Sequence, residues 1–495
     1  MVTRDGGPTV PRRPGGPPGG PPPGGPPTGG ASGGNNGNGS RQPAGRAMEP
    51  SGRQLEASGR PLVVDDRPRP RRPGGPPERP SASSGPGPRH RPGGARTPKQ
   101  RRRIRRQRHK EMVRRRRTII GRHPKFTILL IVLLLMTPIW VSLGSFMTNP
   151  ANGPVSTRFA EWMRENGGGG IVTSVENFWY SHHQPPKGGK PKSGAIPAPT
   201  KSAIPAPTVG PPHLPPPTAM VPLATPPIAG EGQWHPIGRT VGGIPAMYAA
   251  YVRPDSTYTS EVTGVAWMDT TLLRASLYEG ESIPGSGGPY VNNSPIPASA
   301  ATSLVAAFNS GFLMGDAQGG YYADGHMAVP LVTGAASLVI YRNGTPTVGV
   351  WGRDVTMNAN VVAVRQNLDL IVDNGQPVPG LNQTDNTRWG NTLGGAFRVW
   401  RSGVGVTADG ALVYVGGSGL SIVDLANVLQ HAGAVRAMEM DINTSWVNFF
   451  SFAPPAGQPA SGTNGTRLTN DEVNSPSRYF SASARDFITM SARVP

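Results

Sequence analysis

The segment Ala411–Asn443, with the sequence ALVYVGGSGLSIVDLANVLQHAGAVRAMEMDIN, decides the fold that we predict. Apolar runs typical of strands lie on both sides of a stretch whose apolar residues recur at helical spacing. Ser421 followed three residues later by Asp424 forms a capping box at the start of that helix, and Gly433 is its stop signal. The segment therefore predicts a strand, a capped helix and a second strand.

The second of these strands, expected over Val435–Ile442, ends in acidic residues. Successive side chains of a strand point to opposite faces, so alternate residues lie on the same face of the sheet. One face then carries Glu439, Asp441 and Asn443, and the other carries Met438, Met440 and Ile442. Two carboxylates and an amide at the end of a buried strand predict a candidate site, in which burial raises the pKa of Asp441 and the neighbouring Glu439 perturbs it.

Further strands surround this segment within residues 230–495. Alternating or continuous apolar runs bounded by turn pairs such as Asn343-Gly344 and Asp409-Gly410 indicate them. They are expected at Val262–Met268, Leu273–Tyr278, Ser337–Tyr341, Thr347–Trp351, Asp369–Val372, Val404–Thr407 and Leu412–Val415. We therefore predict an α+β fold for the outer domain, with a large mixed β-sheet and packed helices.

The same residues resemble the C-terminal half of the phosphodiester glycosidase domain family. The resemblance is carried by Arg401–Gly405, the turn Gly416–Ser421, the helix after it, and Ala437–Asp441, with an upstream match at Ala306–Phe312. It covers roughly residues 233–452. Where the family usually has Leu-Asp-Gly-Gly-Gly-Ser, this chain has Met-Asp-Ile-Asn-Thr-Ser at 440–445, so the three glycines are replaced. Glycines at such a place let the backbone approach a ligand closely.

The resemblance implies roles for individual residues. Asp441, with Glu439, would transfer protons, Arg401 would stabilise phosphate charge, and Asn309 would position the sugar. Each has a structural alternative: Asp441 capping backbone amides, Arg401 pairing with an acid of the sheet, and Asn309 shaping the turn at Gly311.

Four more residues are candidate substrate ligands. Asn443 shares the face of Asp441, and Ser418 lies in the turn before the capped helix, whose first amides can receive an anion unless they are only capped by Ser421. Asp324 and His326 lie in a polar, glycine-rich loop, where His326 is a candidate proton donor or a solvated surface residue. The sequence contains neither a nucleotide-binding P-loop nor a histidine-rich metal motif, and we expect no cofactor and no metal, with an Asp/Glu site for a hard cation as the open alternative.

Composition divides the chain into a basic N-terminal part and an acidic C-terminal part. The net charge of +20 comes from the first part, because no Lys follows Lys201 and acids outnumber Arg after residue 230. The charge is therefore no argument for nucleic-acid binding by the outer domain. The 495 residues include no Cys, which excludes disulfides, thiolate metal sites and cysteine catalysis.

The N-terminal half predicts a membrane anchor. Residues 1–100 are rich in Gly, Pro and Arg and are expected to be disordered, and residues 101–125 form a basic juxtamembrane segment. Residues 126–146 are free of charge and long enough to span a hydrocarbon core. The positive-inside rule places the N-terminus in the cytoplasm and the C-terminal domain outside, as in a single-pass type II protein of the cell membrane, with anionic lipid headgroups at the basic segment.

Two segments are expected between the span and the outer domain. In residues 147–183, Ser156 is a candidate cap for a short amphipathic helix that ends at Gly167–Gly170, and a second helix is expected over Ile171–Trp179. Their aromatic residues suit either the membrane interface or packing against the domain. Residues 184–229 are rich in proline and predict an extended stalk.

Together these patterns predict an extracytoplasmic hydrolase, similar to phosphodiester glycosidases, that cleaves a sugar phosphodiester or related glycan linkage of the cell envelope. One alternative is a non-catalytic protein that binds an envelope glycan, because the three glycines of the motif are replaced. Another is a structural tether between a cytoplasmic partner and the cell wall.

Overall fold

The computed structural model describes residues 97–116, 124–148, 154–197, 210–285, 288–381, 388–390 and 398–493. The tail predicted to be disordered lies outside these residues as far as residue 96. Its last residues were predicted wrongly, since Pro98 begins helix α1 (Pro98–Arg116), which contains most of the basic segment. Residues with long cationic side chains have high helix propensity, so a basic run of this composition readily forms a helix.

Helix α3 (Pro124–Thr148) contains the predicted span. An 18-residue window within residues 125–148 has a mean hydropathy of 2.5, and this is the one helix, among the residues described, that is long and apolar enough to cross a membrane. Helices α4 (Val155–Met163) and α5 (Gly169–His182) follow, joined by the π-helical turn η2 (Arg164–Gly168). Gly167 has φ of +84°, a conformation that favours glycine, and this breaks the helix at the predicted place. The predicted cap is wrong, because Pro154 precedes the first turn of α4 and Ser156 lies inside it.

The strand-rich part of the chain contains three larger sheets and a small hairpin. The largest sheet has eight strands in the order β1-β4-β5-β16-β15-β17-β13-β14. Its strands are β1 (His235–Pro236), β4 (Met247–Val252), β5 (Thr263–Met268), β16 (Leu412–Leu420), β15 (Val399–Thr407), β17 (Ala434–Glu439), β13 (Leu370–Asp373) and β14 (Gln376–Pro377).

Two five-stranded sheets accompany it, in the orders β11-β10-β12-β8-β9 and β19-β18-β7-β20-β6. The strands of the first are β8 (Tyr321–Ala323), β9 (His326–Val329), β10 (Ala336–Tyr341), β11 (Pro346–Val350) and β12 (Val361–Gln366). Those of the second are β6 (Leu273–Tyr278), β7 (Leu304–Asn309), β18 (Phe449–Phe452), β19 (Gly465–Arg467) and β20 (Phe487–Ala492). The remaining elements are the hairpin β2 (Thr240–Val241) and β3 (Ile244–Pro245), the short helix α6 (Ala298–Ala301) and the 3-10 turn η4 (Arg478–Phe480).

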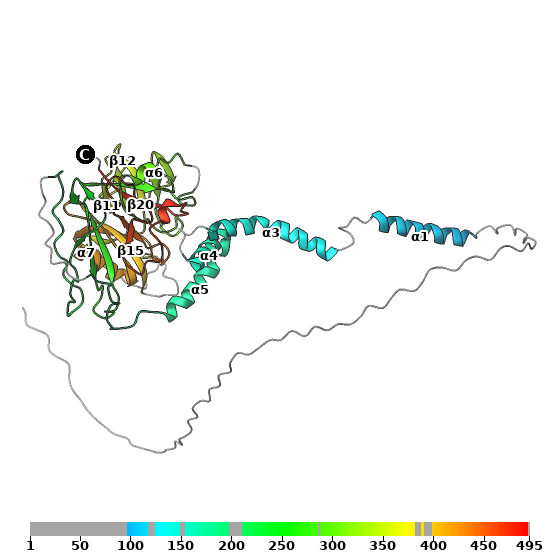
Figure 1. Cartoon of the computed structure of the whole chain (residues 1–495), viewed down its shortest axis with the longest axis horizontal. Coiled ribbons are helices and arrows are strands. Elements are labelled where there is room, and N and C mark those ends of the chain that lie inside the picture. Colours follow the sequence, from blue (N-terminus) through cyan, green and yellow to red (C-terminus); the bar gives the residue numbers. More distant parts are fainter. Residues whose placement is uncertain are drawn as a thin grey trace, which may run out of the picture. The chain divides into compact units, whose positions relative to one another are not determined.

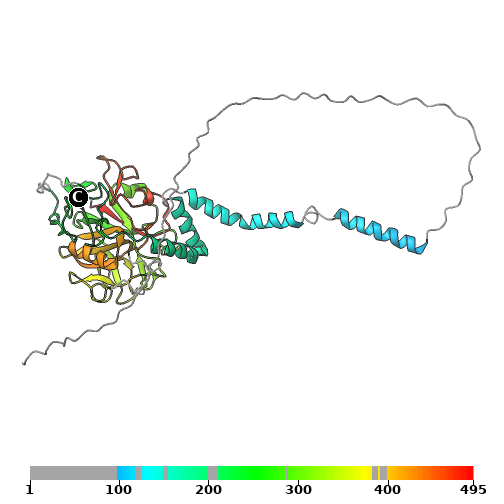
Figure 2. The same ribbon diagram turned by 90° about the horizontal axis from the view of Figure 1, so that it is seen from below.

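The prediction of one mixed sheet is therefore wrong in two respects. The described strands divide among several sheets, and the ladders between named strands are antiparallel, as in the pairs β15–β16 and β10–β11. The turns at Asn343-Gly344 and Asp409-Gly410 explain the direction, since a tight hairpin can join only antiparallel strands. Figure 2 shows these layered strands from a second direction.

Helix α7 (Ile422–His431) packs on one face of the eight-stranded sheet (Figure 1). Its Ser421 accepts a hydrogen bond from the Asp424 amide and the Asp424 side chain accepts one from the Ser421 amide, so the predicted capping box is confirmed. Leu425, Val428 and Leu429 of this helix share a core with sheet residues such as Val413. The opposite face of the sheet, with Met438 and Tyr414, packs against the two five-stranded sheets in a second core. The large sheet is thus buried on both faces, which holds its strand ends rigidly.

The predicted stalk over residues 184–229 is wrong for the part near the domain. The Leu214 amide donates to Asp269 Oδ2 at 2.8 Å, and the buried Arg253 guanidinium donates to the carbonyl of Pro226 at 2.6 Å. Met220 and Ala224 are buried in the domain. Proline lacks an amide proton but keeps its carbonyl, so a proline-rich strand can still be bound along a folded surface. Residues 210–229 therefore belong to the domain.

Candidate active site

Asn309, the last residue of β7, lies at the centre of a buried polar network. Its Nδ2 donates to Ser402 Oγ at 3.0 Å and to the Ser310 carbonyl at 2.9 Å. Its Oδ1 accepts from the Tyr414 hydroxyl at 2.7 Å and from the Asn448 amide at 3.2 Å. All four hydrogen-bonding positions of the amide are thus used inside the protein. Asn309 fixes the strand ends around the site, and its side chain has no spare donor for a sugar.

Asp441 lies beside this network, just beyond the end of β17. The strand ends at Glu439, earlier than predicted, but the Ser402 amide still donates to the Asp441 carbonyl at 2.8 Å. The Asp441 carboxylate accepts from the Ile442 amide at 2.8 Å and from Arg485 at 2.7 Å. Burial raises the pKa of Asp441, and the Arg485 guanidinium opposes that rise. A buried carboxylate with a raised pKa at the edge of a cavity is suited to proton transfer.

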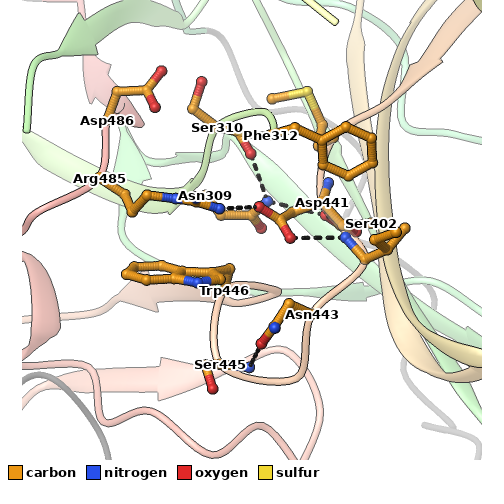
Figure 3. A network of polar contacts seen from close by, with 12 residues as sticks. Asn309, Ser310, Phe312, Ser402, Asp441, Asn443, Ser445, Trp446, Arg485 and Asp486 are labelled. Atoms are coloured by element: carbon orange, nitrogen blue, oxygen red, sulfur yellow. Dashed lines mark hydrogen bonds and ion pairs between the residues drawn. The ribbon is translucent and has the colours of Figure 1, made fainter. Parts of the chain in front are cut away.

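Two arginines and a tryptophan complete the surroundings of Asp441. The guanidinium carbon of Arg485 lies 4.5 Å from the centre of the Trp446 ring, and that of Arg478 lies 4.4 Å from it. Figure 3 shows the Asp441 carboxylate facing Arg485, with the Trp446 ring alongside. Burial lowers the pKa of Arg478, whereas the charge of Asp441 raises it. Two cations held on one aromatic ring beside a carboxylate form a site that can accept an anionic group.

Two cavities adjoin Asp441. The larger, of about 300 Å³, is lined by Asp441, Arg485, Trp446 and Phe312, together with Arg164 and Gly169 from the helices after the span. The smaller, of about 10 Å³, shares Asp441, Trp446 and Arg485 with the larger one. It is also lined by Asn309, Ser310, Arg478 and Asp486.

Three buried polar atoms around the small cavity have no hydrogen-bond partner among the described residues. They are Ser310 Oγ, Arg478 Nε and Asp486 Oδ1. Leaving buried polar groups unpaired costs free energy, so such groups in a native site commonly receive a ligand or water. The small cavity beside Asp441, of about 10 Å³, is therefore polar and has roughly the size of one water molecule.

Arg401 and Glu439 are not part of this cavity lining. They form an ion pair inside the sheet, Arg401 being 2% exposed and Glu439 1% exposed, and Arg401 Nε also donates to the Leu420 carbonyl at 3.1 Å. Burial raises the pKa of Glu439 to about 7, although Arg401 opposes the rise and Asp441 adds to it. The structure therefore supports the alternative considered from the sequence, in which Arg401 pairs with an acid that holds the sheet, and that acid is Glu439.

The other predicted ligands lie in different places. Asn443 lines the larger cavity and its Oδ1 accepts from the Ser445 amide at 2.8 Å. Ser418 donates to Glu261 at 2.8 Å and lines a separate cavity of about 190 Å³. Asp324 accepts from the Val291 amide at 2.8 Å, and His326 lies with its ring 5.5 Å from that of Tyr290. Ser418, Asp324 and His326 line neither cavity at Asp441.

Arg485, Arg478, Trp446 and Asp486 are the site residues that the sequence analysis missed. Arg478, Arg485 and Asp486 lie downstream of the stretch that carries the family resemblance, in a segment without a strong periodic pattern. The available signal was Trp446, which directly follows the Asp-Ile-Asn-Thr-Ser motif. No group of three or more acidic or histidine side chains in the described ranges is placed to hold a metal ion. The expectation of a cofactor-free reaction stays a prediction.

Glu279 makes the stability of this domain depend on pH. It is 2% exposed, its Oε2 has no partner among the described residues, and burial raises its pKa to about 8, with Asp324 and Asp486 adding to the rise. The folded state then binds its proton more tightly than the unfolded state, so the stabilising contribution is present at pH values below about 4.5 and is lost as pH rises to about 8.

We therefore expect the free energy of unfolding to fall between pH 5 and pH 8, and the fall to be smaller for Glu279→Gln. Denaturant titrations at several pH values measure both. Because Glu439 and Glu472 act in the same direction, the difference between the variant and the unaltered chain isolates Glu279. A variant with the same slope as the unaltered chain contradicts the assignment.

The comparison with family models agrees with the sequence resemblance. The family model described as phosphodiester glycosidase matches residues 302–445. Among solved structures, the chain is similar to the zebrafish N-acetylglucosamine-1-phosphodiester alpha-N-acetylglucosaminidase catalytic domain, auto-inhibited by its pro-peptide, at 16% identity and a TM-score of 0.34. That alignment covers 52% of this chain and 87% of the other. A hypothetical protein from Synechocystis matches at 13% identity and a TM-score of 0.29, covering 50% of this chain and 63% of the other.

Comparison with curated proteins gives no match. The family match at residues 302–445 includes Asn309, Arg401 and Asp441 and ends just before Trp446. Residues 302–445 of the chain thus match the model of the phosphodiester glycosidase family.

Proposed function

We propose that this protein hydrolyses a glycosyl phosphodiester of the cell envelope, with Asp441 as the acid–base group and Arg485 as the phosphate ligand. The observation that carries the proposal is the 2.7 Å contact between Asp441 and Arg485 at the wall of a cavity of about 300 Å³. A sugar phosphodiester has a reacting carbon beside a negatively charged phosphate. A carboxylate next to a guanidinium matches that arrangement.

The proposed reaction breaks the bond between the anomeric carbon and the phosphate oxygen. Asp441 takes a proton from a water molecule as the water oxygen bonds to the anomeric carbon. The electron pair of the broken bond stays on the phosphate oxygen. Asp441 then returns the proton to solvent, and the products are a free sugar and a phosphate monoester. Charge grows on the phosphate during this step, which is where Arg485 and Arg478 act.

Arg485 and Arg478 replace Arg401 as the proposed phosphate ligands. Both lie within 4.5 Å of the Trp446 ring centre, and stacking on the ring restricts the orientations of each guanidinium. Arg478 also keeps a buried Nε proton without an acceptor among the described residues. A phosphate group supplies acceptors for such protons, and a planar guanidinium donates two parallel hydrogen bonds to it.

We also propose that a membrane anchor holds the domain, and therefore the reaction, outside the cell. Helix α3 is apolar along its length, and the basic α1 precedes it whereas the segment just after it has no Lys or Arg. The positive-inside rule then directs the C-terminal domain to the outer side, as a single-pass type II protein. The partners are an envelope glycan or glycosyl phosphodiester and the membrane lipids, with no role for nucleic acid.

Arg485→Gln tests the phosphate role. Loss of the cation is expected to lower kcat/KM about a hundredfold, because a donor to the developing negative charge is removed. Since Arg485 also holds down the pKa of Asp441, the acidic limb of the plot of kcat/KM against pH should move to higher pH. Arg342→Gln, an exposed arginine that donates to the Ala359 carbonyl, is the control. An unchanged acidic limb would show that Arg485 does not act on the reacting carboxylate.

A second candidate function is binding of an envelope glycan without turnover. Ile442 stands where the family has its first glycine, and its side chain packs with Phe312 and Leu368 beside the cavity. A bulky residue there reduces the space in which a substrate can approach the backbone. Under this alternative, the full chain binds a glycosyl phosphodiester, releases no sugar from it, and binds equally well after Asp441→Asn.

A further inference from the structure

We infer that helices α4 and α5 seat the Asp441 cavity on the membrane surface, so that the substrate is a lipid-linked glycosyl phosphodiester. The inference rests on the proposed hydrolysis and on α3 crossing a membrane. It concerns the substrate class, which the family match leaves open. Its evidence is a series of contacts that leads from the end of α3 to the reacting carboxylate, together with an apolar face on α5.

The first contacts join α4 to the end of the candidate span. The Arg158 guanidinium donates to the Met147 carbonyl at 2.7 Å, and Trp162 Nε1 donates to Ser142 Oγ at 3.1 Å. Ser142 and Met147 lie in the last two turns of α3. Two side chains on successive turns of α4 therefore bind the C-terminal end of α3, so the two helices pack against each other.

The same helices reach the cavity. Thr157 Oγ1 lies 3.5 Å from Ser445 Oγ, in the loop that follows Asp441. Arg164 of η2 and Gly169 of α5 line the 300 Å³ cavity with Asp441 and Arg485. The nine residues of α4 rise about 14 Å in total. The cavity is thus within about the length of one short helix of the point where α3 ends.

Helix α5 presents an apolar face to the outside of the molecule. Ile171, Val175, Phe178 and Trp179 are 63%, 63%, 67% and 57% exposed, and their spacing places them on one side of the helix. Aromatic and aliphatic side chains in this arrangement are typical of helices that lie in the interfacial layer of a bilayer. Because α5 is linked through α4 to the end of α3, the bilayer that surrounds α3 is the surface that covers this face.

A cavity held at the lipid surface favours a substrate that is anchored in the same surface. The lipid tail stays in the bilayer, and the phosphodiester and sugar extend to the height at which Arg485 and Asp441 lie. Hydrolysis releases the free sugar to water and leaves a lipid phosphate monoester in the membrane. Confinement of enzyme and substrate to one surface raises their effective concentration without any further contact.

Fluorescence quenching tests the position of α5 independently of activity. The chain has no Cys, so Val175→Cys in the full chain creates a unique site for an environment-sensitive fluorophore. Ala408→Cys is the control, since residue 408 is exposed in the turn of the β15–β16 hairpin. In vesicles that contain brominated phosphatidylcholine, we expect strong quenching at residue 175 and little at residue 408. Equal quenching at the two positions overturns the inference.

Activity on a matched pair of substrates tests the substrate class. The probes are the hexadecyl and the methyl phosphodiesters of N-acetylglucosamine 1-phosphate, supplied to the full chain in phosphatidylcholine–phosphatidylglycerol vesicles. We expect kcat/KM for the hexadecyl compound to exceed that for the methyl compound at least about tenfold. The triple variant Ile171→Ser, Val175→Ser, Trp179→Ser should lose this preference and keep its activity on the methyl compound.

A matched control distinguishes an effect of the α5 face from the effect of losing exposed apolar side chains in general. Val291, Val332 and Met357 are exposed apolar residues of the strand-rich domain, and their replacement by Ser should leave the preference unchanged. Equal turnover of both probes by the unaltered chain overturns the inference and leaves the hydrolase proposal intact. Turnover of neither probe contradicts the proposed function and with it the substrate class, while the quenching at residue 175 still decides whether α5 lies on the membrane.

Discussion

Asp441→Asn is expected to lower kcat/KM for glycosyl phosphodiester hydrolysis about a thousandfold, the size of a lost acid–base group. Asparagine has nearly the same volume and keeps an oxygen that can accept from the Ile442 amide, which now donates to the carboxylate at 2.8 Å. The fold should therefore persist while the proton acceptor is lost. Release of free sugar and of phosphate monoester, followed together, measures the effect.

The control for this variant is Asp369→Asn. Asp369 is a half-exposed carboxylate whose side chain pairs with Arg388 at 2.9 Å, so its loss removes an acid without touching the cavity. Activity should be unchanged in the control. If Asp441→Asn hydrolyses the substrate as fast as the unaltered chain, Asp441 is a structural carboxylate and the mechanism is wrong. If the unaltered chain and Asp441→Asn both release no sugar but bind the glycan equally well, the binding alternative holds.

Arg401→Met is expected to destabilise the domain by about 3–5 kcal/mol, because it leaves one member of a buried ion pair without its partner. Arg401 and Glu439 are both almost completely buried, and Glu439 already has a pKa raised to about 7. Without the guanidinium this pKa rises further, so the stability lost relative to the unaltered chain should grow as pH rises above about 7, where Glu439 is ionised only in the unaltered chain. Denaturant unfolding at several pH values measures both the size and the pH dependence.

The double variant Arg401→Met, Glu439→Leu should regain most of the lost stability, since apolar side chains of similar volume can replace a buried ion pair. Arg353→Met provides the matched surface control. Its side chain is 50% exposed and pairs with Asp354 and Asp373, so its removal should cost at most about 1 kcal/mol. If Arg401→Met is as stable as the unaltered chain and has lost only substrate affinity, Arg401 is a phosphate ligand and not a structural ion-pair residue.

Local patterns in the sequence predicted an element correctly where neighbouring residues alone determine its structure. The capping box of Ser421 and Asp424 begins α7 as predicted, and the strand expected at Leu273–Tyr278 is β6 with the same bounds. Strand β15, by contrast, begins five residues before the predicted Val404. Between its apolar start at Val399–Trp400 and Val404 lie Arg401, Ser402 and Gly403, which are polar or lack a side chain, and pairing with β16 makes them part of the strand.

The candidate site depended more on distant partners than on motifs. Asn309 and Asp441 were predicted together and both line the small cavity. Arg401 was expected beside them, but the carboxylate of Glu439, two residues before Asp441, pairs with it inside the sheet. The guanidinium that does reach Asp441 comes from Arg485, 44 residues further along the chain. No local pattern marks that arginine, because its role arises only when the segment before β20 passes the end of β17.

The sequence by itself determined the order of the chain's parts: a basic segment, one apolar segment of spanning length, and a strand-rich domain that bears a family motif. These properties follow from the composition and spacing of nearby residues, which act before any long-range contact forms. Only the tertiary structure decided which charges pair and what lies over the cavity. Arg401 pairs with Glu439 inside the sheet and Arg485 with Asp441, because burial makes each charge take the nearest opposite partner in space, whatever its distance in sequence. The contact between Thr157 of α4 and Ser445 likewise joins residues that only the folded chain brings together.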